Sequence, residues 1–119
     1  MAESDAKLNV RVEDDVTVVE FVDRNILDEG SIQQIGQEIG DLIDQAASPK
    51  LLISFENVEH LSSAALGTLI TINNKVREKD GQLRLTNIAP PIYEVFTITK
   101  LDKLFHIHPT TEKAMRSFT

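Results

Sequence analysis

Short apolar runs alternate with segments of helical periodicity along most of the chain, and this alternation limits the fold more than any other feature. The runs that predict strands cover residues 8–12, 16–22, 51–55, 83–85 and 104–107. The segments that predict helices cover residues 32–46, 64–79, 90–98 and 109–118. The predicted order is therefore β-β-α-β-α-β-α-β-α. This order indicates an α/β domain with a mixed sheet, in which mostly parallel central strands are covered by about four helices.

Local signals mark several boundaries between these elements. Asp14 and Asp15 predict the turn of a hairpin between the first two strands. Ser31 is the predicted N-cap of the first helix. Gly36 and Gly40 lie inside that helix, where each costs about 1 kcal/mol relative to alanine. We therefore expect the helix to pack closely against a neighbouring element at these glycines.

The length of 119 residues fits one domain with a single core. Residues 1–7 are polar, lack the apolar run of a secretory signal and are expected to form a flexible tail. No run approaches the roughly 18 apolar residues of a membrane span. The sequence has no cysteine, which excludes disulfides and thiolate chemistry. Together these features predict a cytoplasmic protein.

The formal net charge of −7 bears on the class of partner. A nucleic-acid binder needs a basic face to neutralise phosphates, and anionic membranes also attract basic segments, so neither partner is expected. A partner protein with a basic patch fits better, because complementary charge speeds encounter. The alternative is that the acidity only keeps the protein soluble.

The residues that commonly carry catalysis do not form a recognisable set. His106 and His108 share one face of a predicted strand, but two ligands without a third make a poor metal site. His60 could act as a base toward a nearby serine, yet no orienting group follows it and the nucleophile-elbow glycines are missing. No glycine pattern predicts a phosphate-binding loop. We therefore expect no enzyme activity, no metal and no cofactor.

Two adjacent hydroxyls, Ser62 and Ser63, stand where a loop meets the start of the second long helix. The simplest interpretation is that one of them caps the helix, a contribution of about 1 kcal/mol. The functional alternative is modification. A phosphate at this position would face free backbone N–H groups and the positive end of the helix dipole, so the fold would tolerate it.

This segment resembles the phosphoacceptor loop of STAS domains, the family of bacterial anti-sigma factor antagonists. In that family an apolar strand and a loop precede Asp-Ser-Ser-Gly-Leu-Gly. Alignment on Leu66 and Gly67 puts Ser63 at the phosphorylated serine and Ser62 where the family often has aspartate. Ala65 replaces the glycine of the pattern. The missing aspartate removes a carboxylate beside the acceptor, which bears on kinase recognition.

The resemblance extends over residues 8–118. Ile26-Leu27-Asp28 is similar to the Leu-Asp that follows the second strand of the family and lies near the acceptor serine. Residues 80–85 resemble its Gly-Gly-x-Leu turn and strand, and residues 101–107 resemble its Leu-Asp-x-Leu-Phe-x-Ile ending. No one of these motifs is specific, but their order along the chain matches the family throughout.

The resemblance implies a cycle of partner switching. The unphosphorylated protein would bind an anti-sigma factor that is also a serine kinase, and so free a sigma factor. The kinase would phosphorylate Ser63, with Ser62 as the alternative acceptor, and a phosphatase would reverse the step. The implied contact residues are Asp28, Ser62, Ala64, Gly67, Thr68, Thr71 and Lys75. The protein itself would be a monomer or a weak dimer.

Two rival interpretations stay open at this stage. STAS-like proteins also build stress-sensing assemblies or serve as subunits of lipid-transport complexes, so the chain could be a scaffold without phosphate turnover. It could also bind a small ligand, because α/β folds hold such molecules at the carboxyl ends of strands, and an apolar pocket would favour this interpretation. Fold alone does not choose among these functions.

Overall fold

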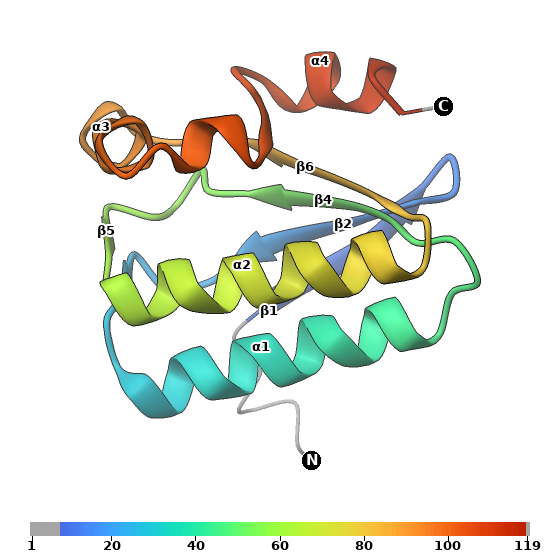
Figure 1. Ribbon diagram of the computed structural model, residues 1–119, viewed down its shortest axis with the longest axis horizontal. Helices are drawn as coiled ribbons and strands as arrows, with labels where there is room; N and C mark the ends of the chain where they lie inside the picture. The colour runs from blue at the N-terminus through green and yellow to red at the C-terminus, as the bar shows by residue number, and fades with distance from the viewer. Residues whose placement is uncertain (1–7, 119) are drawn as a thin grey trace.

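The computed structural model describes residues 8–118, and its main sheet is mixed and has five strands. Figure 1 shows how the helices lie around this sheet. The strands are β1 (Leu8–Glu13), β2 (Val16–Phe21), β4 (Lys50–Ser54), β6 (Gln82–Thr86) and β7 (His106–His108). They lie in the order β1-β2-β4-β6-β7, with β1 antiparallel to β2 and all other neighbours parallel. The predicted mixed sheet with a parallel centre is confirmed. The flexible tail predicted for residues 1–7 lies outside the described residues.

The hairpin of β1 and β2 turns at Asp14 and Asp15, as predicted. Both residues have positive φ angles, 50° and 70°, a conformation that aspartate adopts more readily than most residues. The two strands differ in burial. Val10 and Val12 of β1 are 45% and 70% exposed, because β1 is the edge strand and lies beyond the helices that cover the rest of the sheet.

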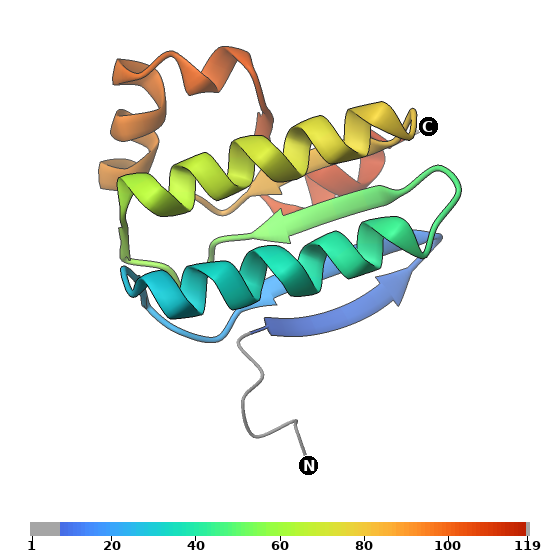
Figure 2. The same cartoon turned by 60° about the horizontal axis from the view of Figure 1, so that its bottom comes forward.

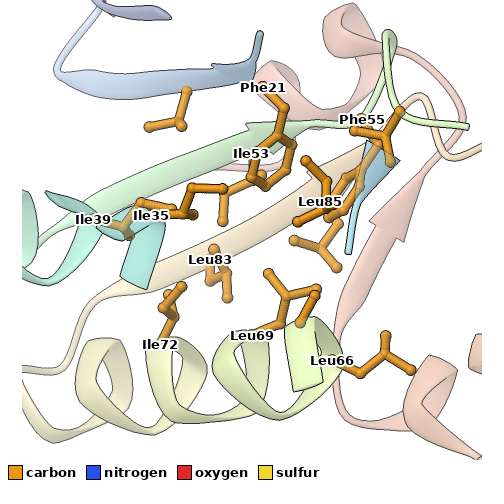
Figure 3. Packing of buried hydrophobic residues seen from close by; sticks show 14 of the residues in the cluster. Phe21, Ile35, Ile39, Ile53, Phe55, Leu66, Leu69, Ile72, Leu83 and Leu85 are labelled. Atoms are coloured by element: carbon orange, nitrogen blue, oxygen red, sulfur yellow. The ribbon is translucent and has the colours of Figure 1, made fainter. Parts of the chain in front are cut away.

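Two long helices, α1 (Glu29–Asp44) and α2 (Ser63–Glu78), lie side by side on one face of the sheet (Figures 1 and 2). Their apolar faces close the main core together with β2, β4 and β6. Figure 3 shows this packing, in which the rings of Phe21 and Phe55 lie 5.1 Å apart between their centroids. Burial of these apolar side chains, at about 25 cal/mol per Å² removed from water, is the main stabilising contribution to the fold.

The two glycines of α1 lie where the helices touch, which confirms the predicted close packing. A Cβ atom on Gly36 would lie 2.9 Å from Cγ2 of Thr68, and one on Gly40 would lie 3.2 Å from Nζ of Lys75. A side chain at Gly36 would therefore push α2 away from α1.

The C-terminal third contains α3 (Pro90–Ile98), the 3-10 helix η2 (Leu101–Lys103) and α4 (Thr111–Arg116). The α4 helix packs on the face of the sheet opposite α1 and α2, where Ala114 joins a small core with Val16, Val18 and Leu52. Of the apolar residues predicted for the third helix, Ile92 and Phe96 are buried, whereas Val95 and Ile98 are exposed.

Four local predictions are wrong. Asp28, and not Ser31, caps α1, because the helix begins three residues earlier in a polar first turn that has no apolar period. The strand predicted at 104–107 is displaced to β7, since η2 occupies the preceding residues. The last helix ends at Arg116 and starts at Thr111, so it is shorter than predicted. The sequence analysis also missed β3 (Asn25–Ile26) and β5 (His60–Leu61), which pair in a second, two-stranded sheet.

Candidate functional site at the start of helix α2

Ser62 is the N-cap of α2. Its backbone is extended, with φ −83° and ψ 165°, and its Oγ accepts a hydrogen bond from the Ala65 N–H at 3.2 Å. The Ser62 carbonyl accepts the first helical bond, from the Leu66 N–H at 3.2 Å. The capping role predicted for one of the two serines therefore falls to Ser62, whose hydroxyl is engaged in holding the helix start.

Ser63, the first residue of α2, is exposed to solvent. Within residues 8–118 its hydroxyl makes no hydrogen bond, and the N–H groups of Ser63 and Ala64 have no acceptor. First-turn N–H groups have no partner inside their own helix, and they carry the partial positive charge of the helix dipole. The Ser63 hydroxyl is thus accessible at an electropositive helix start, while the cap beside it is already formed.

The small sheet of β3 and β5 fixes the loop that leads to Ser63. Its register pairs Asn25 with His60 and Ile26 with Leu61. The Ser62 N–H donates to the Ile26 carbonyl at 3.1 Å. A side-chain hydrogen bond of 2.7 Å also joins His60 Nδ1 to Asn25 Oδ1. Buried Ile26 anchors the pair to the core. The loop before α2 is therefore tied to the segment that precedes α1.

Asp28 lies two residues after Ile26, as Ser63 lies two residues after Leu61. Because these strands are parallel and in register, the starts of α1 and α2 emerge beside each other. The Asp28 carboxylate caps α1 by accepting from the Ser31 N–H at 2.9 Å, and it is exposed. The structure therefore brings Asp28 to the same edge of the molecule as the two serines.

The other predicted contact residues lie along α2. Ala64, Gly67 and Thr71 are exposed, and Gly67 has open space around it. Thr68 and Lys75 are half-buried and, with Thr71, line a groove of about 250 Å³ between α1 and α2. The ammonium of Lys75 is engaged there, 3.1 Å from the Asp44 carboxylate and 3.5 Å from the Gly40 carbonyl.

Among the described residues, the start of α2 presents one exposed hydroxyl, that of Ser63, beside the capping hydroxyl of Ser62. The His60 ring bonds to Asn25, and no bond joins it to Ser62 or Ser63 in the described part of the chain. Among residues 8–118 no cluster of three or more potential metal-ligating side chains occurs. Over the same residues, no helix combines the length and apolar character needed to cross a membrane.

Sequence reasoning missed the residues that position this loop. Strands of two residues are too short to show a period, so β3 and β5 gave no signal. The pairing of Asn25 with His60 spans 35 positions and depends on the fold. The sequence marked this segment through Ile26-Leu27-Asp28, whose resemblance to a family motif predicted a position near the serines but no strand.

Comparison with known proteins agrees with the fold described above. Residues 7–114 match the STAS domain family. The anti-sigma F factor antagonist of Paenibacillus polymyxa is 18% identical over 75% of this chain and 76% of its own. A STAS domain anti-sigma factor antagonist from Planctomyces limnophilus is 27% identical, with a TM-score of 0.85 over 94% of this chain and 97% of its own. The Bacillus cell fate determinant SpoIIAA in its phosphorylated form is 21% identical, with a TM-score of 0.70 over 92% and 96%. Since the match covers nearly all of the chain and agrees with the fold, the protein belongs to the STAS domain family.

Proposed function

We propose that the protein is an anti-sigma factor antagonist whose docking to an anti-sigma factor with serine kinase activity is switched by phosphorylation of Ser63. The observation that carries the proposal is that the hydroxyls of two neighbouring serines are used differently. Ser62 holds the cap of α2, and Ser63 offers an exposed hydroxyl that the fold does not use. The names of the relatives and the phosphorylated form known for SpoIIAA support this choice.

The chemistry of the switch is a phosphoryl transfer. The partner kinase transfers the γ-phosphoryl group of ATP to Ser63 Oγ, so that a phosphate ester forms, ADP leaves and the hydroxyl proton is released. A phosphatase returns the hydroxyl by hydrolysis. The added group carries about 1.5 to 2 negative charges at neutral pH. It would lie beside the unpartnered N–H groups of Ser63 and Ala64, which are suited to an anion, so the helix would remain folded.

Docking would change even though the fold does not. A partner that covers the start of α2 in the unmodified state would have to bury the phosphate in the modified state. Removing an uncompensated charge from water costs several kcal/mol, which is enough to separate two proteins. Asp28 and Glu29 already place negative charge at the neighbouring start of α1, and a phosphate would increase it. We assign the docking surface to Asp28 and the exposed residues of α2, with Thr68, Thr71 and Lys75 at its groove.

The test uses the cognate kinase, ATP and a matched pair of serine variants. Mass spectrometry after incubation should locate phosphate on Ser63 of the wild-type protein and of Ser62→Ala, and none on Ser63→Ala. Ser63→Ala should bind the kinase whether or not ATP is present, whereas Ser63→Asp should bind it at least about tenfold more weakly, because a buried charge of this kind exceeds about 1.4 kcal/mol.

Two outcomes would contradict the proposal. Phosphate on Ser62 alone would move the acceptor to the capping residue. Equal binding by Ser63→Ala and Ser63→Asp would remove the switch altogether. A stable assembly that forms without any phosphate turnover would instead support the scaffold function.

A further inference from the structure

The outer edge of β1 is the outermost edge of the main sheet on the side of the hairpin (Figure 2). β2 lies on one side of β1, and no described strand lies on the other. Such an edge presents a row of unpaired N–H and C=O groups, which proteins usually protect with proline, a bulge or charged side chains. β1 contains no proline, and its pairing with β2 runs from Leu8 to Glu13 without a bulge. The edge is therefore open to a further strand.

The turn at Asp14 and Asp15 determines which backbone groups of β1 point outward. Both residues have positive φ angles and stand between the paired residues Glu13 and Val16, which defines a two-residue hairpin turn. In such a turn the flanking residues are hydrogen-bonded to each other. Bonded and non-bonded pairs alternate along antiparallel strands, so every second residue counted back from Glu13 bonds to β2. The residues between them direct their N–H and C=O groups away from β2, and these are Leu8, Val10 and Val12.

The side chains of β1 form an apolar face and a polar face. Val10 lies opposite Val19 of β2, so it points to the face of the sheet that α1 and α2 cover. Val10 and Val12 are nevertheless 45% and 70% exposed. Arg11 points to the other face, where its guanidinium lies 3.3 Å from the Glu20 carboxylate of β2. Since Arg11 is held toward β2, its charge does not extend across the open edge.

A second copy of β1 fits this edge best in one antiparallel register. When Val10 lies opposite Val10 of the second copy, Leu8 lies opposite Val12 on both sides. All three outward-directed residues then form hydrogen-bonded pairs. Arg11 lies opposite Asn9, so no like charges face each other. A shift by two residues in either direction leaves only two of these pairs within β1, and one of the two shifts places Arg11 opposite Arg11, which is unfavourable.

Apolar contact and charge favour the same register. The apolar side chains of both copies would lie next to one another on one face of the joined sheet, because directly opposite residues share a face. Lys7 precedes β1 in the sequence and lies outside the described residues. In this register position 7 comes opposite Glu13 of the second copy at both ends of the pairing. The edge is therefore complementary to itself in hydrogen bonding, in apolar surface and in charge.

We infer that the chain forms a symmetric dimer in which β1 of each copy pairs with β1 of the other, so that two five-stranded sheets become one. A two-fold pairing closes on itself, so dimers form and longer assemblies do not. A contact made by one short strand belongs to the small, transient interfaces of less than about 1,200 Å², so the dimer should depend on protein concentration.

This dimer does not depend on the function proposed for Ser63. The α2 helix packs on β6, which lies on the far side of β2 and β4 from β1. Pairing at β1 therefore leaves Ser63 exposed in both copies, and each dimer would present two starts of α2.

Analytical ultracentrifugation of the wild-type protein from about 10 μM to about 1 mM tests whether the dimer forms. A salt concentration of about 0.3 M screens the repulsion between two chains of net charge −7. The weight-average mass should rise toward that of two chains and no further. Ser63→Ala should associate like the wild type, which separates the dimer from the proposed switch. A mass that stays at that of one chain, or that passes that of two, would overturn the inference.

The variants Val10→Lys and Val10→Glu test the register. Each places two like charges directly opposite each other, so each variant alone should dimerise at least about tenfold more weakly than the wild type. An equimolar mixture of the two should dimerise again, because lysine then faces glutamate. Val95→Lys is the matched control, since Val95 is 40% exposed but lies on α3, and it should associate like the wild type. A mixture that stays monomeric, or a control that weakens equally, would contradict the pairing.

A cysteine scan gives a second measurement that does not require a charge at the interface. The chain has no cysteine, so a single introduced cysteine shows which residues meet. In a hydrogen-bonded antiparallel pair the Cα atoms lie about 5.5 Å apart, a distance that a disulfide can span. Val10→Cys should therefore form a disulfide-linked dimer under mild oxidation, whereas Val12→Cys and Val95→Cys should do so much more slowly. Equal rates for the three variants would indicate random collision and would overturn the inference.

Discussion

The helices α1 and α2 have the same length, 16 residues, and lie side by side on the same sheet, but their ends are built differently. At its start α1 carries two carboxylates, the cap Asp28 and the first-turn Glu29. The start of α2 has a neutral cap, Ser62, and no acidic residue in its first turn. One helix start therefore already has its negative charge, and the other has room for an anion.

At the C-terminal ends it is α1 that lacks a charge of its own, and α2 that has one. The last turn of α1 has no basic residue of its own. Lys79, which follows α2, donates instead to the carbonyls of Ile43 and Asp44 at 3.0 and 3.1 Å. The α2 helix has Lys75 and Arg77 in its own last turn. The comparison teaches that the positive charge at the end of α1 comes from Lys79, whereas α2 has basic residues of its own at its end. At the start of α2 no negative charge offsets the helix dipole, and this is where we propose that phosphate is added.

The largest effect should come from the contact between the helices. Gly36→Leu should lower the free energy of unfolding by about 1–3 kcal/mol, because its side chain would overlap Thr68. The matched control is Gly67→Ala on α2, where nothing lies within 4 Å of the new Cβ. It should raise stability by up to about 1 kcal/mol through helix propensity. Chemical denaturation measures both, and equal effects would show that the helices do not touch at Gly36.

Next in size are the two caps. Asp28→Ala should cost about 1–2 kcal/mol, because it removes both a cap bond and a charge that favours the helix dipole. Ser62→Ala should cost about 1 kcal/mol, since it removes the cap bond alone. Raising the salt concentration should shrink the first loss more than the second. If the two losses respond to salt alike, the charge on Asp28 contributes nothing to α1.

A smaller loss is expected at the shared C-terminal end. Lys79→Met should cost about 0.5–1 kcal/mol, because the Ile43 and Asp44 carbonyls at the end of α1 would lose the charged Lys79 ammonium as a donor. Arg77→Met, nearby but without a bond to α1, should change stability by less than about 0.5 kcal/mol. Equilibrium denaturation of the pair tests whether α2 completes α1, and equal values would refute it.

The smallest effect concerns the open helix start itself. Ser62→Asp should stabilise the protein by about 0.3–1 kcal/mol at low ionic strength, since it places a carboxylate at an uncompensated dipole. Ser31→Asp adds the same charge to the first turn of α1, beside Asp28 and Glu29, and should give no gain. A comparable gain at Ser31 would mean that the two helix starts are electrostatically equivalent after all.

Much of this architecture is predictable from the sequence, because long periodic segments such as β2, β4 and α2 bury one face or both and so carry an apolar pattern. Helix starts are harder. The apolar period of α1 begins at Ile32, yet the helix begins at Glu29, so Ser31 was assigned the role that belongs to Asp28. The difference of three residues arises because the first turn is polar and so shows no apolar period.

The local structure at the start of α2 was predictable in outline but not in its details. The pair Ser62-Ser63 indicates a cap and an exposed hydroxyl, but the choice between them depends on a single-residue shift of the helix start. Asn73 was predicted on the apolar side of α2 and is buried there.

The pairing of β3 with β5 has a consequence for binding kinetics and entropy. The Ser62 and Glu59 amides donate to Ile26 and Arg24, respectively, before any partner arrives. A loop of free chain would lose conformational entropy when a partner ordered it, typically about 1 kcal/mol or more per residue. Here that ordering is completed during folding, so the docking surface that we propose is preorganised. Under the switch that we propose, the energy difference between phosphorylated and unphosphorylated complexes would then reflect the phosphate alone rather than a rearrangement of the chain that carries it.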